Sequence, residues 1–154
     1  MIFAVMSMGL SSCGFTPVYG ESSSARETLE NVMLEDPVSR TEQIFLKAVE
    51  QRLPRPVNPK YQVKYRIELS YQGLDVIGAS RVQVFGRVVS ELVDLNTLAV
   101  KFGFTVDGFT GYSTTREFEE VQRKDAEARL LQILADQFIT RLMIESDKLG
   151  ANDG

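Results

Sequence analysis

The chain has 154 residues but no histidine and only one cysteine. Histidine is the commonest general base and transition-metal ligand, so its absence removes Ser-His and Cys-His nucleophile pairs and most transition-metal sites. A single cysteine excludes an intrachain disulfide and a thiolate metal cluster. We therefore expect a protein that is not an enzyme and that uses no metal ion or other diffusible cofactor.

A strong excess of positive charge is also absent. The formal net charge is −4, although residues 55–101 carry seven basic and four acidic side chains. Proteins dedicated to nucleic acid have a much larger basic excess, so we expect no DNA or RNA partner. A local basic face in the middle of the chain remains compatible with a partner that bears phosphate groups.

The N-terminus is apolar but short. Residues 1–12 contain no charged side chain and end in small residues directly before Cys13. This pattern is typical of a secretory signal peptide, and it is too short to cross a bilayer, which needs about 20 residues. Such a signal usually opens with a basic residue, whereas the first one here is Arg26, which leaves room for a translation start upstream of Met1.

The residues around the cysteine resemble a bacterial lipobox, Leu10-Ser11-Ser12-Cys13-Gly14. We predict cleavage before Cys13 and lipidation of its thiol, with each buried acyl CH₂ contributing about 0.8 kcal/mol to membrane anchoring. The absence of aspartate after the cysteine resembles the signal for delivery to the outer membrane. The alternative is a buried free cysteine at the end of an apolar strand.

We expect four segments: the signal peptide at 1–12, a lipidated N-terminus and tether at 13–37, one domain at 38–150, and a tail at 151–154. The tether contains a serine-rich run and no sustained period before Leu29. A short edge strand at 29–34 is compatible with the pattern. With 44% hydrophobic and 25% charged residues, the remaining chain can bury a core.

Two patterns predict amphipathic helices. Ser39 and Glu42 have the spacing of a capping box, and apolar residues recur at three and four positions from there to Leu53, before Pro54 and Pro56. A second apolar stripe runs from about Arg116, and Gly150 is a natural end for it. We expect helices at about 40–53 and 116–150.

Alternation of apolar and polar residues predicts three strands between these helices. It is regular at 61–72, and it recurs at 81–95 and from 98 to 106, with a loop at 73–80 and a hairpin turn at 94–97. The expected fold is α+β with the order β-α-β-β-β-α. In it, the two amphipathic helices pack on one face of a mostly antiparallel sheet.

The first residues after the expected cleavage site resemble the lipopolysaccharide-assembly lipoprotein family LptE, whose members begin Cys-Gly-Phe-x-Pro-x-Tyr-Gly. Here that motif is Cys13-Gly14-Phe15-Thr16-Pro17-Val18-Tyr19-Gly20. The resemblance implies an outer-membrane lipoprotein on the periplasmic side that plugs the β-barrel LptD. It also implies that the protein assists delivery of lipopolysaccharide to the outer leaflet, without catalysis.

Five basic residues are candidates for contact with lipopolysaccharide phosphates. They are Lys64, Arg66, Arg81, Arg87 and Lys101. The first two alternate with the apolar residues of their strand and should share one face, and the other three lie on neighbouring strands and join them there if the strand register allows. The alternative is an ordinary polar sheet face on which these cations pair in part with Glu68 and Glu91.

Aromatic residues divide into two groups. Phe109 and Tyr112, near Gly111, are candidate contacts to the barrel wall from a loop or strand end. The remaining set lies on the apolar phase of its strands and should pack in the core: Tyr61, Tyr65, Phe102 and Phe104.

Glu119, Glu120 and Asp125 gather near the start of the last helix. A carboxylate pair is one way to build an acid-base or metal site, but acidic residues are favoured in a first helical turn by the helix dipole alone. We expect the second explanation.

Three alternatives to a barrel plug stay open. They are an accessory lipoprotein of another envelope lipid-transport system, a non-catalytic envelope spacer, and a periplasmic hydrolase with a carboxylate site. The hydrolase requires a cleft with perturbed carboxylates, which nothing in the sequence demands.

Overall fold

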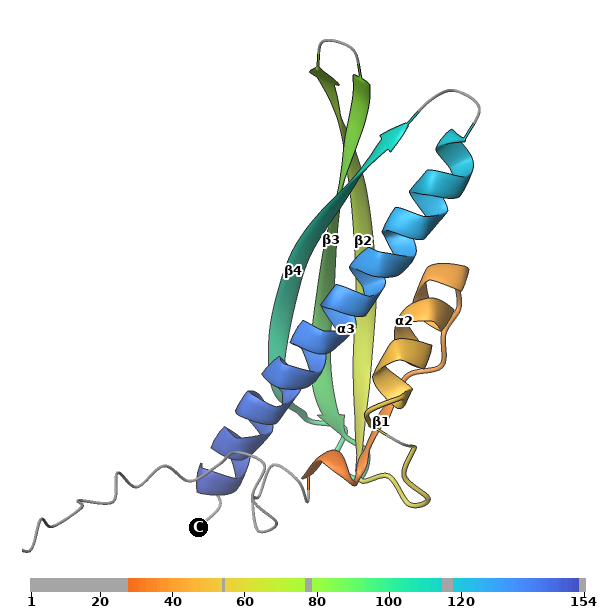
Figure 1. Ribbon diagram of the computed structural model, residues 1–154. Helices are drawn as coiled ribbons and strands as arrows, with labels where there is room; N and C mark the ends of the chain where they lie inside the picture. The colour runs from red at the N-terminus through yellow and green to blue at the C-terminus, as the bar shows by residue number, and fades with distance from the viewer. Residues whose placement is uncertain (1–27, 54, 77–78, 115–117, 153–154) are drawn as a thin grey trace, which may run out of the picture.

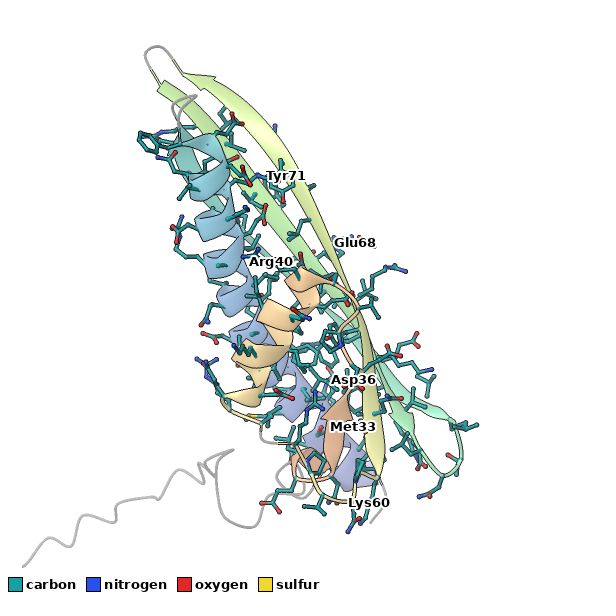
Figure 2. All side chains as sticks on the ribbon, turned by 90° about the vertical axis from the view of Figure 1, so that its right-hand side faces the viewer. Met33, Asp36, Arg40, Lys60, Glu68 and Tyr71 are labelled. Carbon is teal, nitrogen blue, oxygen red and sulfur yellow. The ribbon has the colours of Figure 1, made fainter. Side chains whose placement is uncertain are left out.

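The computed structural model describes residues 28–53, 55–76, 79–114 and 118–152 (Figure 1). The expected order β-α-β-β-β-α and the α+β class are confirmed, and both helices lie on one side of the sheet (Figures 1 and 2). The elements are β1 (Val32–Leu34), α2 (Arg40–Glu50), β2 (Tyr61–Val76), β3 (Ala79–Asp94), β4 (Val100–Thr114) and α3 (Glu119–Asn152).

The four strands form one sheet in the order β1-β2-β3-β4. Both β2–β3 and β3–β4 are antiparallel, whereas β1 runs parallel to β2 with Val32 opposite Tyr61. Strand β1 lies inside the segment that we assigned to the tether, so the sheet reaches further toward the N-terminus than that boundary.

The prediction of a loop at 73–80 was wrong. Strand β2 continues to Val76 and β3 begins at Ala79, so the hairpin stays paired almost to its tip. Gly73 does not interrupt the ladder, because backbone hydrogen bonding in a sheet does not depend on the side chain. The apolar alternation fades in this region, which is why the pattern suggested a loop.

The predicted turn between the last two strands is confirmed. Asp94 Oδ1 accepts hydrogen bonds from the backbone N–H groups of Asn96, at 2.9 Å, and Thr97, at 3.0 Å. These two bonds lower the pKa of the Asp94 carboxyl. Leu98 completes the turn in the left-handed region, with φ of 59°.

Helix α2 begins with the predicted capping box. Ser39 Oγ accepts from the Glu42 backbone N–H at 3.2 Å, and Glu42 Oε2 accepts from the Ser39 backbone N–H at 3.2 Å. The helix ends at Glu50 rather than Leu53, where the chain leaves it through a turn. In the described part of the chain, neither helix is long and apolar enough to cross a membrane.

The core lies between the helices and one face of the sheet. Phe45 of α2 and Phe138 of α3 are fully buried and meet edge-on, with ring centroids 5.4 Å apart. Core packing of the four strand aromatics is confirmed. Phe104 is buried, and the other three are partly buried against the same cluster: Tyr61, Tyr65 and Phe102.

Candidate functional site

Among the described residues, one face of the sheet carries no helix, and we call it the uncovered face. Glu68 lies on the side of β2 away from the helices, whereas Tyr71 lies on the helix side (Figure 2). The Tyr71 hydroxyl donates a hydrogen bond to Glu127 Oε1 of α3 at 2.7 Å. Alternation and strand register place the following residues on the uncovered face: Lys64, Arg66, Glu68, Ser70, Arg81, Phe85, Arg87, Val89, Glu91, Thr105, Asp107 and Phe109.

Four of the five basic candidates lie on this face, but they do not form one cluster, and the fifth, Lys101, is left without a ladder partner by a register shift between β3 and β4. Lys64 stands opposite Glu91 on β3, and Arg81 is ten positions further along that strand, which is about 33 Å. Arg66, Arg87 and Lys101 lie nearer the Lys64 end. A single phosphate could therefore contact only some of them.

Acidic residues neutralise much of the positive charge. Arg66 Nε lies 3.1 Å from Glu68 Oε1, and Arg87 Nε lies 2.6 Å from Asp107 Oδ1. The bond to Asp107 raises the pKa of the Arg87 guanidinium. Since the side chains of these pairs are exposed to solvent, which screens their charges, each pair contributes little to stability.

Lys101 is also paired, with Asp94 Oδ2 3.8 Å from its Nζ. Among the described residues, Lys64 and Arg81 make no ion pair within 4.0 Å. The expected pairing with Glu68 is therefore found for Arg66, and the uncovered face has mixed charge rather than a uniform basic surface. An approaching anion would meet Lys64 and Arg81 without first displacing a carboxylate.

Two exposed aromatic rings interrupt the charged residues. Phe85 and Phe109 stand opposite each other on β3 and β4, with centroids 6.0 Å apart, and they are 37% and 64% exposed. Sequence reasoning missed Phe85, although its phase, two positions before Arg87, indicates the polar face. The two rings give this face an apolar contact area.

A shallow hollow lies beside the aromatic pair. Its volume is about 310 Å³, and it is open to solvent. Charged and apolar groups meet in it, which is the combination that an amphiphile with a charged headgroup requires. Its lining residues are Glu68, Leu69, Ser70, Phe85, Gly86, Arg87, Asp107 and Gly108.

Phe109 and Tyr112, the candidate barrel contacts, lie on opposite faces of the sheet. Both belong to β4, which runs to Thr114, so the segment is a strand and not a loop. Tyr112 is partly buried against the core under α3, and burial raises the pKa of its phenol. Phe109 remains accessible to a partner on the uncovered face, whereas Tyr112 is accessible only in part.

The carboxylates at the start of α3 pair with neighbouring cations along the helix. Glu120 Oε1 lies 2.6 Å from Lys124 Nζ, which lowers the pKa of the Glu120 carboxyl, and Asp125 pairs with Arg129. These contacts have the helical spacing of four residues. In the described ranges, no group of three or more possible ligands is placed to hold a metal ion.

The predicted signal peptide and the lipidation site at Cys13 lie outside the described residues. Their assignment continues to rest on the lipobox pattern alone. Among the described residues, the uncovered face is the surface that carries the candidate binding residues.

No protein-family model matches the sequence. No curated protein matches it either. Solved structures do resemble the fold. A candidate lipoprotein from Caulobacter crescentus has a TM-score of 0.62 at 14% identity, over 79% of this chain and 95% of that one.

Two further solved structures are similar. A minor lipoprotein from Acinetobacter baumannii has a TM-score of 0.57 at 14% identity, covering 73% of this chain and 88% of that one. The rare lipoprotein B from Shewanella oneidensis has a TM-score of 0.51 at 10% identity, covering 79% and 96%. At such low identities the likeness shows the fold alone, and the chain therefore shares its α+β fold with these three solved structures.

Proposed function

We propose that this chain is a lipid-anchored lipoprotein of the outer membrane. In this role it plugs an LptD-type β-barrel and assists delivery of lipopolysaccharide to the outer leaflet. The observation that carries the proposal is an agreement between two independent features. A lipobox and the Cys-Gly-Phe-x-Pro-x-Tyr-Gly motif begin the expected mature chain, and the domain that follows has the fold of three solved lipoproteins.

The proposal assigns a binding role and no catalytic one. The lipid on Cys13 would hold the protein at the periplasmic face of the membrane, and the folded domain would present its surfaces to the barrel. Phe109 and Phe85 supply apolar contact area for a barrel wall. Aromatic side chains are favoured in such contacts because they bury much area with little loss of conformational entropy.

Contact with lipopolysaccharide would use the uncovered face. Its phosphates would approach Lys64 and Arg81 directly, while Arg66 and Arg87 would exchange their exposed carboxylate partners for phosphate oxygens. We infer that at least two of the five basic residues touch phosphate. Lys64 and Arg66 are the pair to test first, since they lie two positions apart on the same face of β2.

Changing Lys64 and Arg66 together to glutamate should weaken lipopolysaccharide binding by about tenfold or more, because each charge-assisted contact contributes on the order of 1 kcal/mol and repulsion replaces it. Binding is measured by displacement of a fluorescent lipopolysaccharide. The matched control, Arg40→Glu with Lys47→Glu, makes the same charge change on exposed positions of α2. Equal binding by both variants would remove this face from the proposal.

The plug role is tested by purifying the full-length protein from detergent-extracted membranes, with Cys13→Ala as the unlipidated control. Recovery of a large outer-membrane β-barrel in equal amount supports the proposal. Recovery of inner-membrane transporter subunits would instead favour an accessory lipoprotein of another lipid-transport system. Recovery of peptidoglycan alone would favour a spacer.

A further inference from the structure

Strand β4 forms one edge of the sheet, and its outer side has no strand neighbour among the described residues. It is long, running 15 residues from Val100 to Thr114. An edge strand presents a row of backbone N–H and C=O groups that have no partner in the sheet, and native proteins commonly shield such edges with prolines, lysines or short strands. This strand has no proline, and its single lysine, Lys101, lies near its start.

Helix α3 extends beyond the edge of the sheet on which it packs. Its C-terminal half runs out past β4, on the side away from β3 (Figure 1). On the side of α3 next to the free edge of β4, four residues follow one another at spacings of three and four positions: Ile133, Gln137, Thr140 and Ile144. The two isoleucines are 40% and 41% exposed, so no layer of the described residues covers this apolar surface.

A groove lies between the edge of the sheet and the part of α3 that extends past β4. Its volume is about 360 Å³, and its lining surface is mostly apolar. Val106 of β4 forms its floor, and residues of α3 form the rest: Asp136, Gln137, Thr140, Arg141 and Ile144. The groove therefore has the place and polarity of the core that a further strand beside β4 would share with α3.

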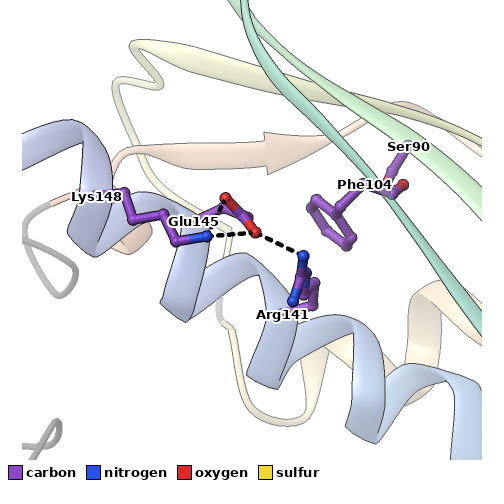
Figure 3. Close-up of polar contacts among 5 residues, drawn as sticks. All are labelled: Ser90, Phe104, Arg141, Glu145 and Lys148. Carbon is purple, nitrogen blue, oxygen red and sulfur yellow. Dashed lines mark hydrogen bonds and ion pairs between the residues drawn. The ribbon is translucent and has the colours of Figure 1, made fainter.

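Arg141, one of the two charged residues on the helix side of this groove, is held in place by an ion pair. Arg141 Nη2 lies 2.9 Å from Glu145 Oε1, and Lys148 binds Glu145 Oε2 at 3.1 Å (Figure 3). The guanidinium is thus drawn along α3 toward Glu145. An apolar side chain entering the groove would meet the aliphatic part of Arg141 and the exposed methyl groups of Ile144.

We propose that the outer edge of β4 accepts an extended segment of a partner protein as a fifth, antiparallel strand. Unpaired backbone groups select an extended chain, and the groove under α3 selects an apolar side chain at every second position. Asp107 is already paired with Arg87 through Oδ1, but its side chain is 58% exposed on the other face of β4, so it favours a second basic residue directly opposite on the free edge. This inference does not depend on the function proposed above.

The probe is a synthetic fluorescent peptide with the sequence of residues 82–93, used with the full chain. In β3 this sequence alternates apolar residues toward α3 and places Arg87 opposite Asp107. The same register on the free edge of β4 would bring the arginine of the peptide opposite Asp107, which it would share with Arg87 of β3. We expect saturable binding in fluorescence anisotropy, with a Kd of about 10–100 μM.

Ile144→Asp should weaken peptide binding by about tenfold, because it places a charge where the proposal buries an apolar side chain. Val121→Asp is the matched control on the same helix, since Val121 is 68% exposed and does not line the groove. We expect the control to bind as the unaltered chain does. Absence of saturable binding up to about 1 mM, or an equal effect of both variants, would overturn the proposal.

Two N-methylated peptides separate strand pairing from simple adhesion. One is methylated at the residues equivalent to 84, 86 and 88, and the other at those equivalent to 85, 87 and 89. A strand added at an edge pairs through only one of its own sides, so one peptide should lose binding and the other should keep it. Loss by both peptides, or by neither, would contradict addition of a strand to β4.

Discussion

At the residue scale, two glycines make room for the longest helix. Gly86 and Gly108 stand opposite each other on β3 and β4. A Cβ at Gly86 would lie 2.7 Å from Leu134 Cδ1, and one at Gly108 would lie 3.3 Å from Leu134 Cδ2. Their missing side chains let Leu134 approach the sheet backbone, and this sets how closely α3 packs.

Gly86→Val should destabilise the fold by about 1–3 kcal/mol, since the added side chain overpacks a filled site. Gly73→Val is the matched control, because no atom lies within 4 Å of a Cβ there. Valine is also favoured in strands, so the control should be neutral or slightly stabilising. The measurement is the free energy of unfolding in urea. Equal values for the two variants would show that the packing of Leu134 does not require the space left by the missing side chain at Gly86.

Tyr65 lies half inside the core, with its ring 5.4 Å from that of Phe45. Within the described part of the chain its hydroxyl has no hydrogen-bond partner. Burial, followed by nearby carboxylates, raises the pKa of Tyr65 to about 12. Burial and the bond to Glu127 raise the pKa of Tyr71 to about 12 as well.

These shifts predict a loss of stability in alkali. A tyrosine in the unfolded chain has a pKa of about 10, so the folded state holds its proton more tightly. The stabilisation is complete below pH 10 and falls as the pH rises toward 12. Tyr65→Phe should reduce this fall, measured as the difference in unfolding free energy between pH 8 and pH 11. An unchanged pH dependence would contradict the assignment.

At the element scale, α2 shows how a local signal specifies the start of a helix. Ser39→Ala removes the side chain that accepts from the Glu42 backbone N–H, and we expect a loss of about 1 kcal/mol. Ser70→Ala is the control, because Ser70 is exposed on β2 and caps no helix. Urea unfolding measures both. A cost for Ser70→Ala as large as that for Ser39→Ala would show that the cap is not the cause.

Local patterns predicted the elements well where their periods were strong. The first helix, the turn at Asp94 and the strand beginning at Tyr61 were confirmed. The extension of β2 to Val76 was missed, because backbone pairing with β3 continues after the apolar alternation has faded. Strand ends are specified by the neighbouring strand and not by the residues themselves.

At the scale of the whole molecule, the order of the strands sets a gradient of protection. Strand β3 is paired on both sides, whereas β4 is paired on one side among the described residues. In native-state hydrogen exchange, β3 amides should be the most protected, and alternate β4 amides should exchange much faster. Equal protection of all β4 amides would show that something already covers this edge.

The candidate site was predictable only in part. Alternation alone places Lys64 and Arg66 on one face of their strand, because side chains along a strand point to opposite sides in turn. It could not show that Arg87 pairs with Asp107, 20 residues away in sequence, or that Phe85 meets Phe109. Those contacts depend on strand register, which no local pattern contains.

The sequence by itself determined the types and order of the elements, the capped helix, the two faces of the sheet and the lipobox at Cys13. The tertiary structure decided the parallel pairing of β1, the pairing of Arg87 with Asp107 and the extension of α3 beyond β4. The physical reason is the separation in sequence over which each effect acts. Propensity and periodicity act over a few neighbouring residues, whereas register and layer width arise from packing between segments far apart in the chain.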